Sequence, residues 1–249
     1  MASAHKSHYK SYYKLNHSVQ DSASVLLTNI NFASVDDPVK TITITSTIPT
    51  EGKSSISIFL AMAIADQKKK VLIIDADLRR PRIGRYLGKR FELGFVNYIM
   101  GEASLDDAIN RLDNPDICFL DCGSKVPNPI EIFESEKFEE MLKLLRERFD
   151  YVIIDSPPVA TFIDSTIIST KTDGTVLVCG YGLVNNKIVQ EAVEQLQNGN
   201  VKILGCVLNK IPQKKNAFGA GSGRFRRYFR YYDNSYEYGA ESNKKKRFK

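Results

Sequence analysis

Short apolar runs and longer amphipathic stretches alternate along the chain from residue 40 to about residue 208. We expect strands over 41–46, 71–75, 117–120, 151–155, 175–179 and 202–208. We expect helices over 19–34, 54–67, 82–88, 94–100, 104–112, 138–149, 164–170 and 186–197, and one more that opens at 127–129 with Pro129 in its first turn. Repeated strand–helix units of this length predict an α/β fold in three layers, with a parallel sheet between two layers of helices.

Two of the predicted strands, 71–75 and 151–155, are almost wholly apolar and each ends in an aspartate, Asp75 and Asp155. Near-continuous apolar runs are typical of strands buried on both faces in a parallel sheet. Ligands of such sheets bind beyond the carboxyl ends of the strands. We therefore expect Asp75, Asp155 and the nearby Asp77 to lie on one rim.

The first strand leads through residues 47–52 into Lys53-Ser54 and a predicted helix. Strand, tight loop, Gly-Lys-Ser and helix form the context of a phosphate-binding loop, in which backbone amides and the helix dipole attract the anion. Lys53 would reach the β- and γ-phosphates, and the Ser54 hydroxyl would take a Mg²⁺ position. Thr47 stands where the usual motif has its first glycine, so the loop sequence alone is weak evidence for a nucleotide site. The acidic strand ends beside it strengthen that interpretation.

The three carboxylates and Ser54 have the composition of a Mg²⁺ site, since Mg²⁺ prefers oxygen ligands and keeps several waters. The competing interpretation is that the acids are solvated strand caps. Two acids that each follow an apolar run, together with Gly-Lys-Ser, favour the nucleotide site.

Charge is concentrated at the end of the chain. Residues 224–249 hold nine basic and three acidic residues, and their net charge of +6 equals that of the whole chain. The remainder is near neutral, which argues against a basic nucleic-acid-binding domain. We divide the chain into a disordered segment 1–18, a body 19–212 and a flexible basic tail 213–249.

Five of the 12 tyrosines lie close together in the tail: Tyr228, Tyr231, Tyr232, Tyr236 and Tyr238. Tyrosine rings are usually buried, so this exposed cluster needs a reason. Phosphorylation would convert a cationic tail into an anionic one. Binding of nucleic acid or of an anionic membrane, and a chance cluster without function, remain alternatives.

No apolar run is long enough for a transmembrane helix, and residues 1–14 lack the apolar core of a signal peptide. We expect a cytoplasmic protein. The four cysteines, Cys118, Cys122, Cys179 and Cys206, have no spacing typical of zinc ligands and are expected to be small buried residues in a reducing compartment.

Five segments together resemble the bacterial tyrosine kinases of capsule and exopolysaccharide synthesis: residues 48–54, 72–81, 126–133, 151–159 and 207–210, closed by the tyrosine cluster. The resemblance covers about residues 20–238 and implies a P-loop NTPase fold. It implies autophosphorylation of the tail tyrosines with ATP and Mg²⁺. It also implies a transmembrane polysaccharide chain-length regulator as an adaptor on a separate chain, protein tyrosine substrates, a tyrosine phosphatase, and recruitment to the inner face of the cell membrane.

The resemblance also implies roles for single residues. The nucleotide would be bound by the loop residues Pro49, Thr50, Glu51, Gly52, Lys53, Ser54 and Ser55, with Asn209 on the adenine side. Ser54, Asp77 and Asp155 would hold Mg²⁺. Asp75 is the candidate base for the tyrosine proton, which has a pKa near 10, although the division of roles between Asp75 and Asp77 stays open.

The sequence departs from the family in two places. Ring-forming members carry Glu-x-x-Arg-x-x-Arg in the first helix, where this chain has Asp21, Ser24 and Leu27, so homo-oligomer formation is in doubt. Thr50 stands where many members have glycine, and we expect it to keep a negative φ.

The runner-up family is the Min/Par-type ATPases, which would make the protein a nucleotide switch that binds a membrane partner. Their loop carries an extra lysine at the position of Ile48, which argues against them.

Overall fold

The computed structural model describes residues 16–33 and 38–212. The expected disorder of residues 1–18 and flexibility of the tail therefore fall almost entirely outside the described residues. Within them, the first helix already begins at His17, where Asn16 accepts a hydrogen bond from the Val19 amide.

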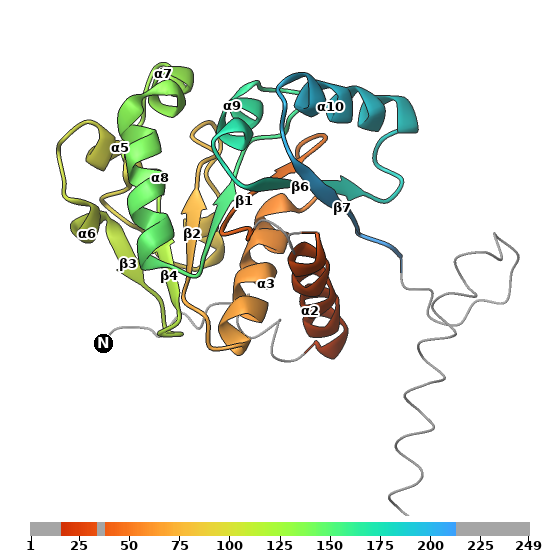
Figure 1. Ribbon diagram of the computed structural model, residues 1–249, viewed down its shortest axis with the longest axis horizontal. Coiled ribbons are helices and arrows are strands. Elements are labelled where there is room, and N and C mark those ends of the chain that lie inside the picture. Colours follow the sequence, from red (N-terminus) through yellow and green to blue (C-terminus); the bar gives the residue numbers. More distant parts are fainter. Residues whose placement is uncertain (1–15, 34–37, 213–249) are drawn as a thin grey trace, which may run out of the picture. The chain divides into compact units, whose positions relative to one another are not determined.

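The described residues form a seven-stranded sheet in the order β3-β4-β2-β5-β1-β6-β7 (Figure 1). The strands are β1 (Thr41–Ser46), β2 (Val71–Asp75), β3 (Ile109–Arg111), β4 (Ile117–Leu120), β5 (Tyr151–Asp155), β6 (Gly174–Gly180) and β7 (Ile203–Asn209). The helices are α2 (His17–Phe32), α3 (Lys53–Asp66), α4 (Ile83–Tyr86), α5 (Phe95–Ile99), α6 (Leu105–Ala108), α7 (Pro129–Glu134), α8 (Glu136–Arg148), α9 (Asp164–Thr170) and α10 (Asn186–Asn198). The predicted α/β architecture is confirmed.

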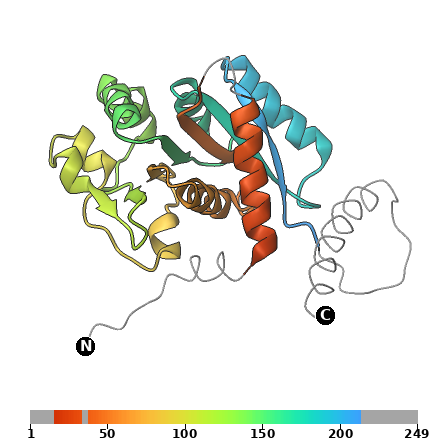
Figure 2. The same cartoon turned by 60° about the horizontal axis from the view of Figure 1, so that its bottom comes forward.

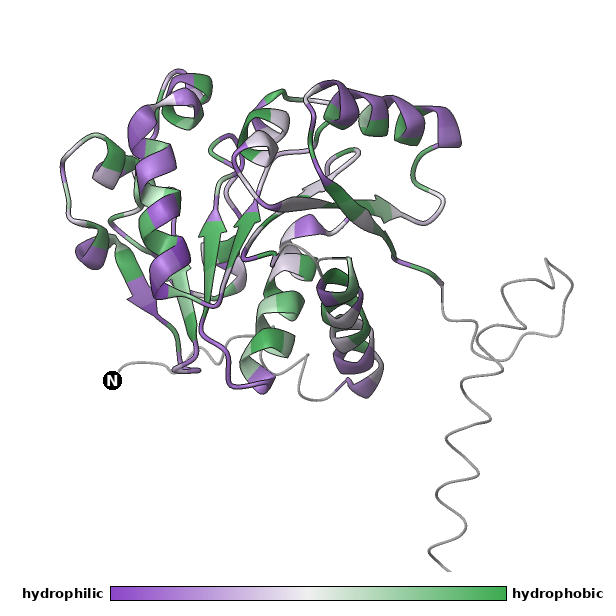
Figure 3. Ribbon diagram, viewed as in Figure 1, coloured by the Kyte–Doolittle hydropathy of each residue, from purple (hydrophilic) through white to green (hydrophobic). Residues whose placement is uncertain are grey.

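Alternation along the buried strands divides the core between the two faces of the sheet. In β2, Val71 and Ile73 pack with α2, α3 and α4, whereas Leu72 and Ile74 pack with the helices of the opposite face. Figures 1 and 2 show α2 beside α3 on one side, and Figure 3 shows apolar residues concentrated in the strands. A strand buried on both faces needs an apolar side chain at nearly every position, which is what these runs supply.

One element was predicted wrongly. The helix expected over 104–112 ends at Ala108, and Ile109–Arg111 forms β3, which pairs antiparallel with β4. The sheet is therefore parallel except at this edge. Ser104 caps the short α6, and the chain then pairs along Phe119 and its neighbours, since β-branched Ile109 fits a strand better than a helix.

Local signals explain the two helices α7 and α8. Asn128 caps α7 and Pro129 occupies its first turn, as predicted. Ser135 caps α8 by accepting from the Phe138 amide at 3.2 Å. The buried face of α8, with Phe138, Met141, Leu142 and Leu145, covers one side of the sheet. Within 16–33 and 38–212, the structure contains no helix long and apolar enough to cross a bilayer.

Candidate functional site

The loop 47–52 joins β1 to α3 at the carboxyl edge of the sheet, as predicted. Two of its residues adopt positive φ: Gly52 at 103° and Thr50 at 72°. The expectation that Thr50 keeps a negative φ is wrong. Tertiary contacts override its local preference, because Lys210 Nζ donates to the Thr50 carbonyl at 2.5 Å and both flanks of the loop are fixed as described below.

Glu51 holds the loop from beneath. Its side chain is fully buried, and its carboxylate accepts hydrogen bonds from the amides of Ile48 at 2.9 Å and Gly180 at 2.8 Å. The carboxylate thus joins the loop to the end of β6. Because both carboxylate oxygens are used in this way, Glu51 can contact a nucleotide only through its backbone.

Asn209, at the end of β7, holds the same loop from the side. Its Nδ2 donates to the Glu51 carbonyl at 2.8 Å. A Cβ at Gly52 would lie 2.2 Å from this Nδ2, so glycine is required here for both its positive φ and the close approach of Asn209.

The lysine of the loop and the acidic strand ends lie close together in the structure, as the sequence predicts. Lys53 Nζ lies 2.9 Å from Asp77 Oδ2 and 3.6 Å from Asp155 Oδ2. Burial disfavours the charged ammonium, but the carboxylates of Asp155 and Asp77 outweigh it and raise the pKa of Lys53. Lys53 is therefore a fixed cation at the start of α3.

Asp75 and Asp155 are direct neighbours in the register of β2 and β5. Both are fully buried. Burial and the charge of Asp155 raise the pKa of Asp75 well above its usual range. Burial also raises the pKa of Asp155, against the opposing effect of Lys53. Asp75 Oδ2 accepts from the amides of Arg82 and Ile83 at 2.9 Å each, so this carboxylate organises the loop after β2.

The donor set fits a magnesium ion. Asp155 Oδ2 is buried without a hydrogen-bond partner, and its only ion-pair partner in the described residues is Lys53 Nζ at 3.6 Å. The Ser54 hydroxyl opposes the rise in the Asp155 pKa that burial causes. A cation would satisfy this orphaned oxygen. In the described part of the chain, no three His, Cys, Asp or Glu side chains are grouped as a metal cluster.

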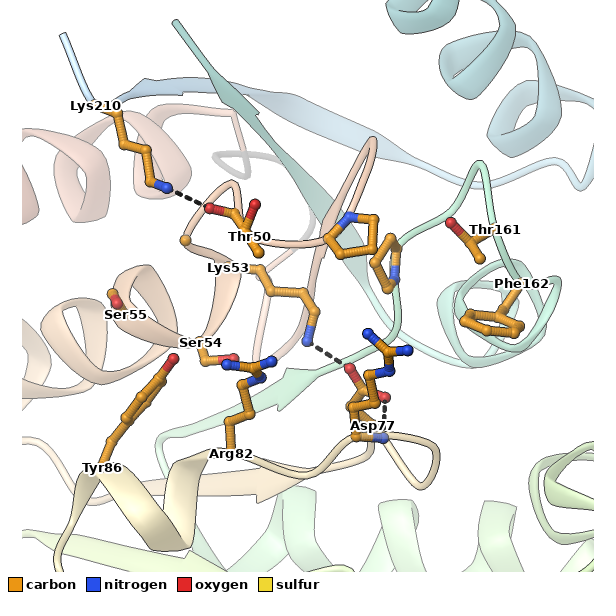
Figure 4. Close-up of a pocket in the computed structure, with 14 residues that line it drawn as sticks. Thr50, Lys53, Ser54, Ser55, Asp77, Arg82, Tyr86, Thr161, Phe162 and Lys210 are labelled. Carbon is orange, nitrogen blue, oxygen red and sulfur yellow. Dashed lines mark hydrogen bonds and ion pairs between the residues drawn. The ribbon is translucent and has the colours of Figure 1, made fainter. Parts of the chain in front are cut away.

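A cavity of about 350 Å³ opens above these groups (Figure 4). Among the predicted residues, it is lined by Pro49, Thr50, Gly52, Lys53, Ser54, Ser55 and Asp77. The other four predicted residues are not part of the lining: Glu51, Asp75, Asp155 and Asn209. Sequence reasoning did not single out Arg80, Arg82, Tyr86, Pro158, Thr161, Phe162 and Lys210, which also line the cavity. The available signal was their position soon after the carboxyl ends of β2, β5 and β7, in loops or, for Tyr86, at the end of the short helix α4.

An ion pair between the half-exposed Arg79 and the buried Asp164 supports one wall of the cavity. Arg79 Nε donates to Asp164 Oδ2 at 2.7 Å, and the side chain of Asp164 is 1% exposed. The Arg79 guanidinium lies 4.2 Å from the centre of the Phe162 ring. This contact fixes the ring at the cavity.

The three positions compared with the ring-forming motif do not share one surface. Asp21 and Ser24 are exposed on α2, whereas Leu27 is 1% exposed and packs in the core. Cys179 is buried as expected, but Cys206 is exposed, with its sulfur 3.3 Å from that of Cys179. The five tail tyrosines lie outside the described residues.

Residues 38–225 match the family ParA, described as an NUBPL iron-transfer P-loop NTPase. The chain is 34% identical over 197 residues to the tyrosine-protein kinase CpsD of Streptococcus pneumoniae serotype 4, covering 79% of this chain and 86% of that protein. It is 35% identical over 193 residues to the tyrosine-protein kinase YwqD of Bacillus subtilis, covering 77% of this chain and 81% of that protein.

Solved structures agree. The kinase domain of the Escherichia coli tyrosine kinase ETK superposes with a TM-score of 0.75 at 28% identity, covering 82% of this chain and 80% of that domain. The cell division ATPase MinD of Pyrococcus furiosus reaches only 0.58 at 25% identity, covering 68% of this chain and 71% of MinD. These likenesses favour the kinases over the Min/Par alternative. The chain belongs to the bacterial tyrosine-protein kinases, which share the ParA-type P-loop fold.

Proposed function

We propose that the protein transfers the γ-phosphoryl group of ATP to tyrosines of its own C-terminal cluster and of other proteins. The observation that carries this function is Lys53, held between Asp77 and Asp155 at the start of α3 and open to the cavity. Such a lysine replaces part of its carboxylate contacts by phosphate oxygens when a nucleotide binds. Family membership selects tyrosine phosphorylation from the reactions that P-loop proteins perform.

The loop 49–55 would bind the phosphates through its backbone amides and Lys53. Asn209 would support the loop from the side on which we expect adenine. Ser54, Asp77 and Asp155 would hold Mg²⁺, which when bound neutralises charge on the phosphates. Positioning and charge stabilisation are the main tasks of a phosphoryl-transfer site, and these residues are already fixed by the contacts described above.

The tyrosine proton needs an acceptor within hydrogen-bond reach. Asp75 has the raised pKa that suits a base, but its Oδ2 accepts from two backbone amides and it does not line the cavity. Asp77 lines the cavity beside Lys53. We assign proton acceptance to Asp77, which would then contact Mg²⁺ through water, and the positioning of the loop 77–83 to Asp75. The resemblance implied Asp75 as the base.

The variants Asp75→Asn and Asp77→Asn test that division. Asp77→Asn is expected to lower kcat at least about a hundredfold, the contribution of a general base, and also to lower thermal stability, because it removes the nearer ion-pair partner of Lys53. Asp75→Asn is expected to raise KM for both substrates with a much smaller effect on kcat, because it weakens the acceptor that holds the loop 77–83. The assignment fails if Asp77→Asn keeps its kcat.

The family resemblance further supports a transmembrane polysaccharide chain-length regulator on a separate chain as adaptor, recruitment to the membrane, and regulation of capsule or exopolysaccharide synthesis. A tyrosine phosphatase would reverse the modification. Because the usual interface arginines are absent at Ser24 and Leu27, any homo-oligomer would use other contacts.

Mapping phosphorylation sites by mass spectrometry tests the function. The protein is incubated with Mg-ATP, alone and with the cytoplasmic segment of the adaptor. Phosphotyrosine is expected at Tyr228, Tyr231, Tyr232, Tyr236 or Tyr238, and the Lys53→Met variant serves as the inactive control. A complete absence of phosphotyrosine in both conditions, with nucleotide-dependent binding to the adaptor retained, would indicate a nucleotide switch instead.

A further inference from the structure

The cavity has an excess of positive charge on its rim. Its lining contains four cationic side chains, Lys53, Arg80, Arg82 and Lys210, and one acidic side chain, Asp77. Lys53 pairs with Asp77, and Lys210 donates to the Thr50 carbonyl. The exposed Arg80 and Arg82 form no ion pair with an acid of the described residues. Two guanidinium groups are thus available for an anionic ligand.

The backbone of both arginines is fixed. The Arg82 amide donates to Asp75 Oδ2 at 2.9 Å, and the Arg80 amide donates to Asp77 Oδ1 at 3.0 Å. These buried acceptors hold the loop after β2 against the cavity. Figure 4 shows the Arg82 side chain beside Lys53 and Asp77. The two side chains therefore start from a pre-organised backbone, which reduces the entropy lost on binding.

Aromatic side chains form another part of the lining of this cavity. Phe162 lines it and is held by the guanidinium of Arg79, whose partner Asp164 is buried. Aromatic rings pack favourably against one another in offset or edge-to-face arrangements. A phenol ring that enters the cavity can therefore contact Phe162 while the residues beside it reach the rim.

The tyrosines of this chain stand in two kinds of sequence. Residues 231–241 contain four tyrosines and three acids, Asp233, Glu237 and Glu241, with no lysine or arginine. Tyr228 instead lies among four arginines, and Tyr9, Tyr12 and Tyr13 lie among lysines without an acid. A rim with unpaired arginines would distinguish these two classes by charge.

We propose that Arg80 and Arg82 recognise acidic residues next to the acceptor tyrosine, so that the kinase selects tyrosines in acidic sequence and disfavours those in basic sequence. This inference rests on the proposed function and deepens it by naming the substrate class. Each phosphate added within 231–241 increases the negative charge of the segment, so phosphorylation of one tyrosine favours that of its neighbours.

Peptide phosphorylation kinetics test the proposal. The enzyme is the full chain with its five tail tyrosines changed to phenylalanine. The substrates are a peptide of residues 231–241 and its D233N/E237Q/E241Q counterpart. Neutralising the acids is expected to raise the peptide KM roughly tenfold, the effect of two or three exposed charge contacts. In the R80Q/R82Q variant, the two peptides are expected to differ by about twofold or less.

Arg111→Gln, an exposed position on β3, is the matched control and should keep the parent's discrimination. In the R80E/R82E variant, a peptide with lysines in place of the three acids should become the better substrate. Fluorescence anisotropy of the same peptides, with a non-hydrolysable ATP analogue present, measures the selection without catalysis.

Different results would contradict the preference for acidic substrates and the kinase function itself. Equal use of acidic and neutral peptides by the parent enzyme would overturn the proposal while leaving the kinase function intact. So would an R80Q/R82Q variant whose only change is a higher KM for ATP, since the arginines would then serve the nucleotide. Absence of all phosphotyrosine would overturn the kinase function and this inference with it.

Discussion

The side-chain amide of Asn209 donates to the carbonyl of Glu51 at 2.8 Å and so ties the end of β7 to the phosphate loop. This contact suggests a second role for a residue that the resemblance placed on the adenine side. The two roles predict different nucleotide preferences when the amide is removed.

We expect Asn209→Ala to weaken ATP and GTP binding by similar factors of about three to ten, the loss of one hydrogen bond. The reason is that the loop, which holds phosphates, loses a lateral support. Isothermal titration calorimetry with both nucleotides measures this. A change confined to ATP would instead indicate that Asn209 acts on the base, and Asn200→Ala, in the turn before β7, is the control.

Removing Lys53 is expected to destabilise the nucleotide-free protein as well as to abolish phosphate binding. Lys53→Met leaves Asp77 and Asp155 without their cation, and breaking a buried charge pair costs about 3 kcal/mol of unfolding free energy. Urea denaturation checks the value. Lys187→Met, whose ion pair with Glu191 is exposed at 3.8 Å, should change stability by less than about 0.5 kcal/mol. Equal effects of the two variants would contradict the prediction.

Ser54→Ala is expected to raise the Mg²⁺ concentration needed for half-maximal nucleotide binding about tenfold, because one oxygen ligand is lost. A fluorescent ATP analogue titrated at several Mg²⁺ concentrations reports the shift. Ser55→Ala removes a hydroxyl one residue further along the same cavity and should leave the Mg²⁺ requirement unchanged. The assignment of Ser54 as a metal ligand is refuted if both variants respond alike.

Thr50→Gly is expected to stabilise the nucleotide-free protein by about 1 kcal/mol, because a β-branched residue at a φ of 72° is strained. Equilibrium unfolding in urea measures the gain. Lys68→Gly is the matched control for the effect of relieving a positive φ alone, because Lys68 has a φ of 61° and lies in the turn after α3, away from the cavity. A loss of stability in Thr50→Gly would show that the threonine side chain contributes more than its backbone strain costs.

Asp173 anchors the start of β1 and should give part of the acid sensitivity of the fold. Its carboxylate accepts from the amides of Lys40 at 2.9 Å and Thr41 at 2.8 Å and pairs with Arg146. Burial would raise the pKa of Asp173, but these donors outweigh it and the pKa is lowered. The stabilisation is therefore complete above the ordinary pKa and is lost as the pH falls through the lowered one.

We expect Asp173→Asn to cost about 2 kcal/mol at pH 7, the range for hydrogen bonds to a charged group. The difference from the parent should stay constant down to about pH 5 and shrink below about pH 4. Urea unfolding across this range checks it. Asp113→Asn, which removes an exposed pair with Lys89, should show little effect at any pH.

The sequence predicted what depends on local pattern and on the topology of a parallel sheet. Two apolar runs that end in acids were enough to predict that Asp75 and Asp155 meet on one rim, and the register of β2 and β5 pairs them directly. The phosphate loop and its lysine followed from the strand–loop–helix context.

The features that escaped prediction depend on tertiary contacts. The three residues of β3 carry no periodic signal and become a strand only through pairing with β4. Thr50, with its positive φ, accepts a hydrogen bond from a lysine 160 positions away in sequence. Arg80, Arg82 and Phe162 lie in loops, where spacing does not indicate which side chains face a cavity.

The buried carboxylate of Glu51 has a kinetic consequence. It fixes the amides of Ile48 and Gly180 before any ligand arrives, so the phosphate loop does not have to fold around the nucleotide. Binding to a preformed loop loses little conformational entropy and needs no slow ordering step. Ordering of the loop then adds no barrier to the association of the nucleotide.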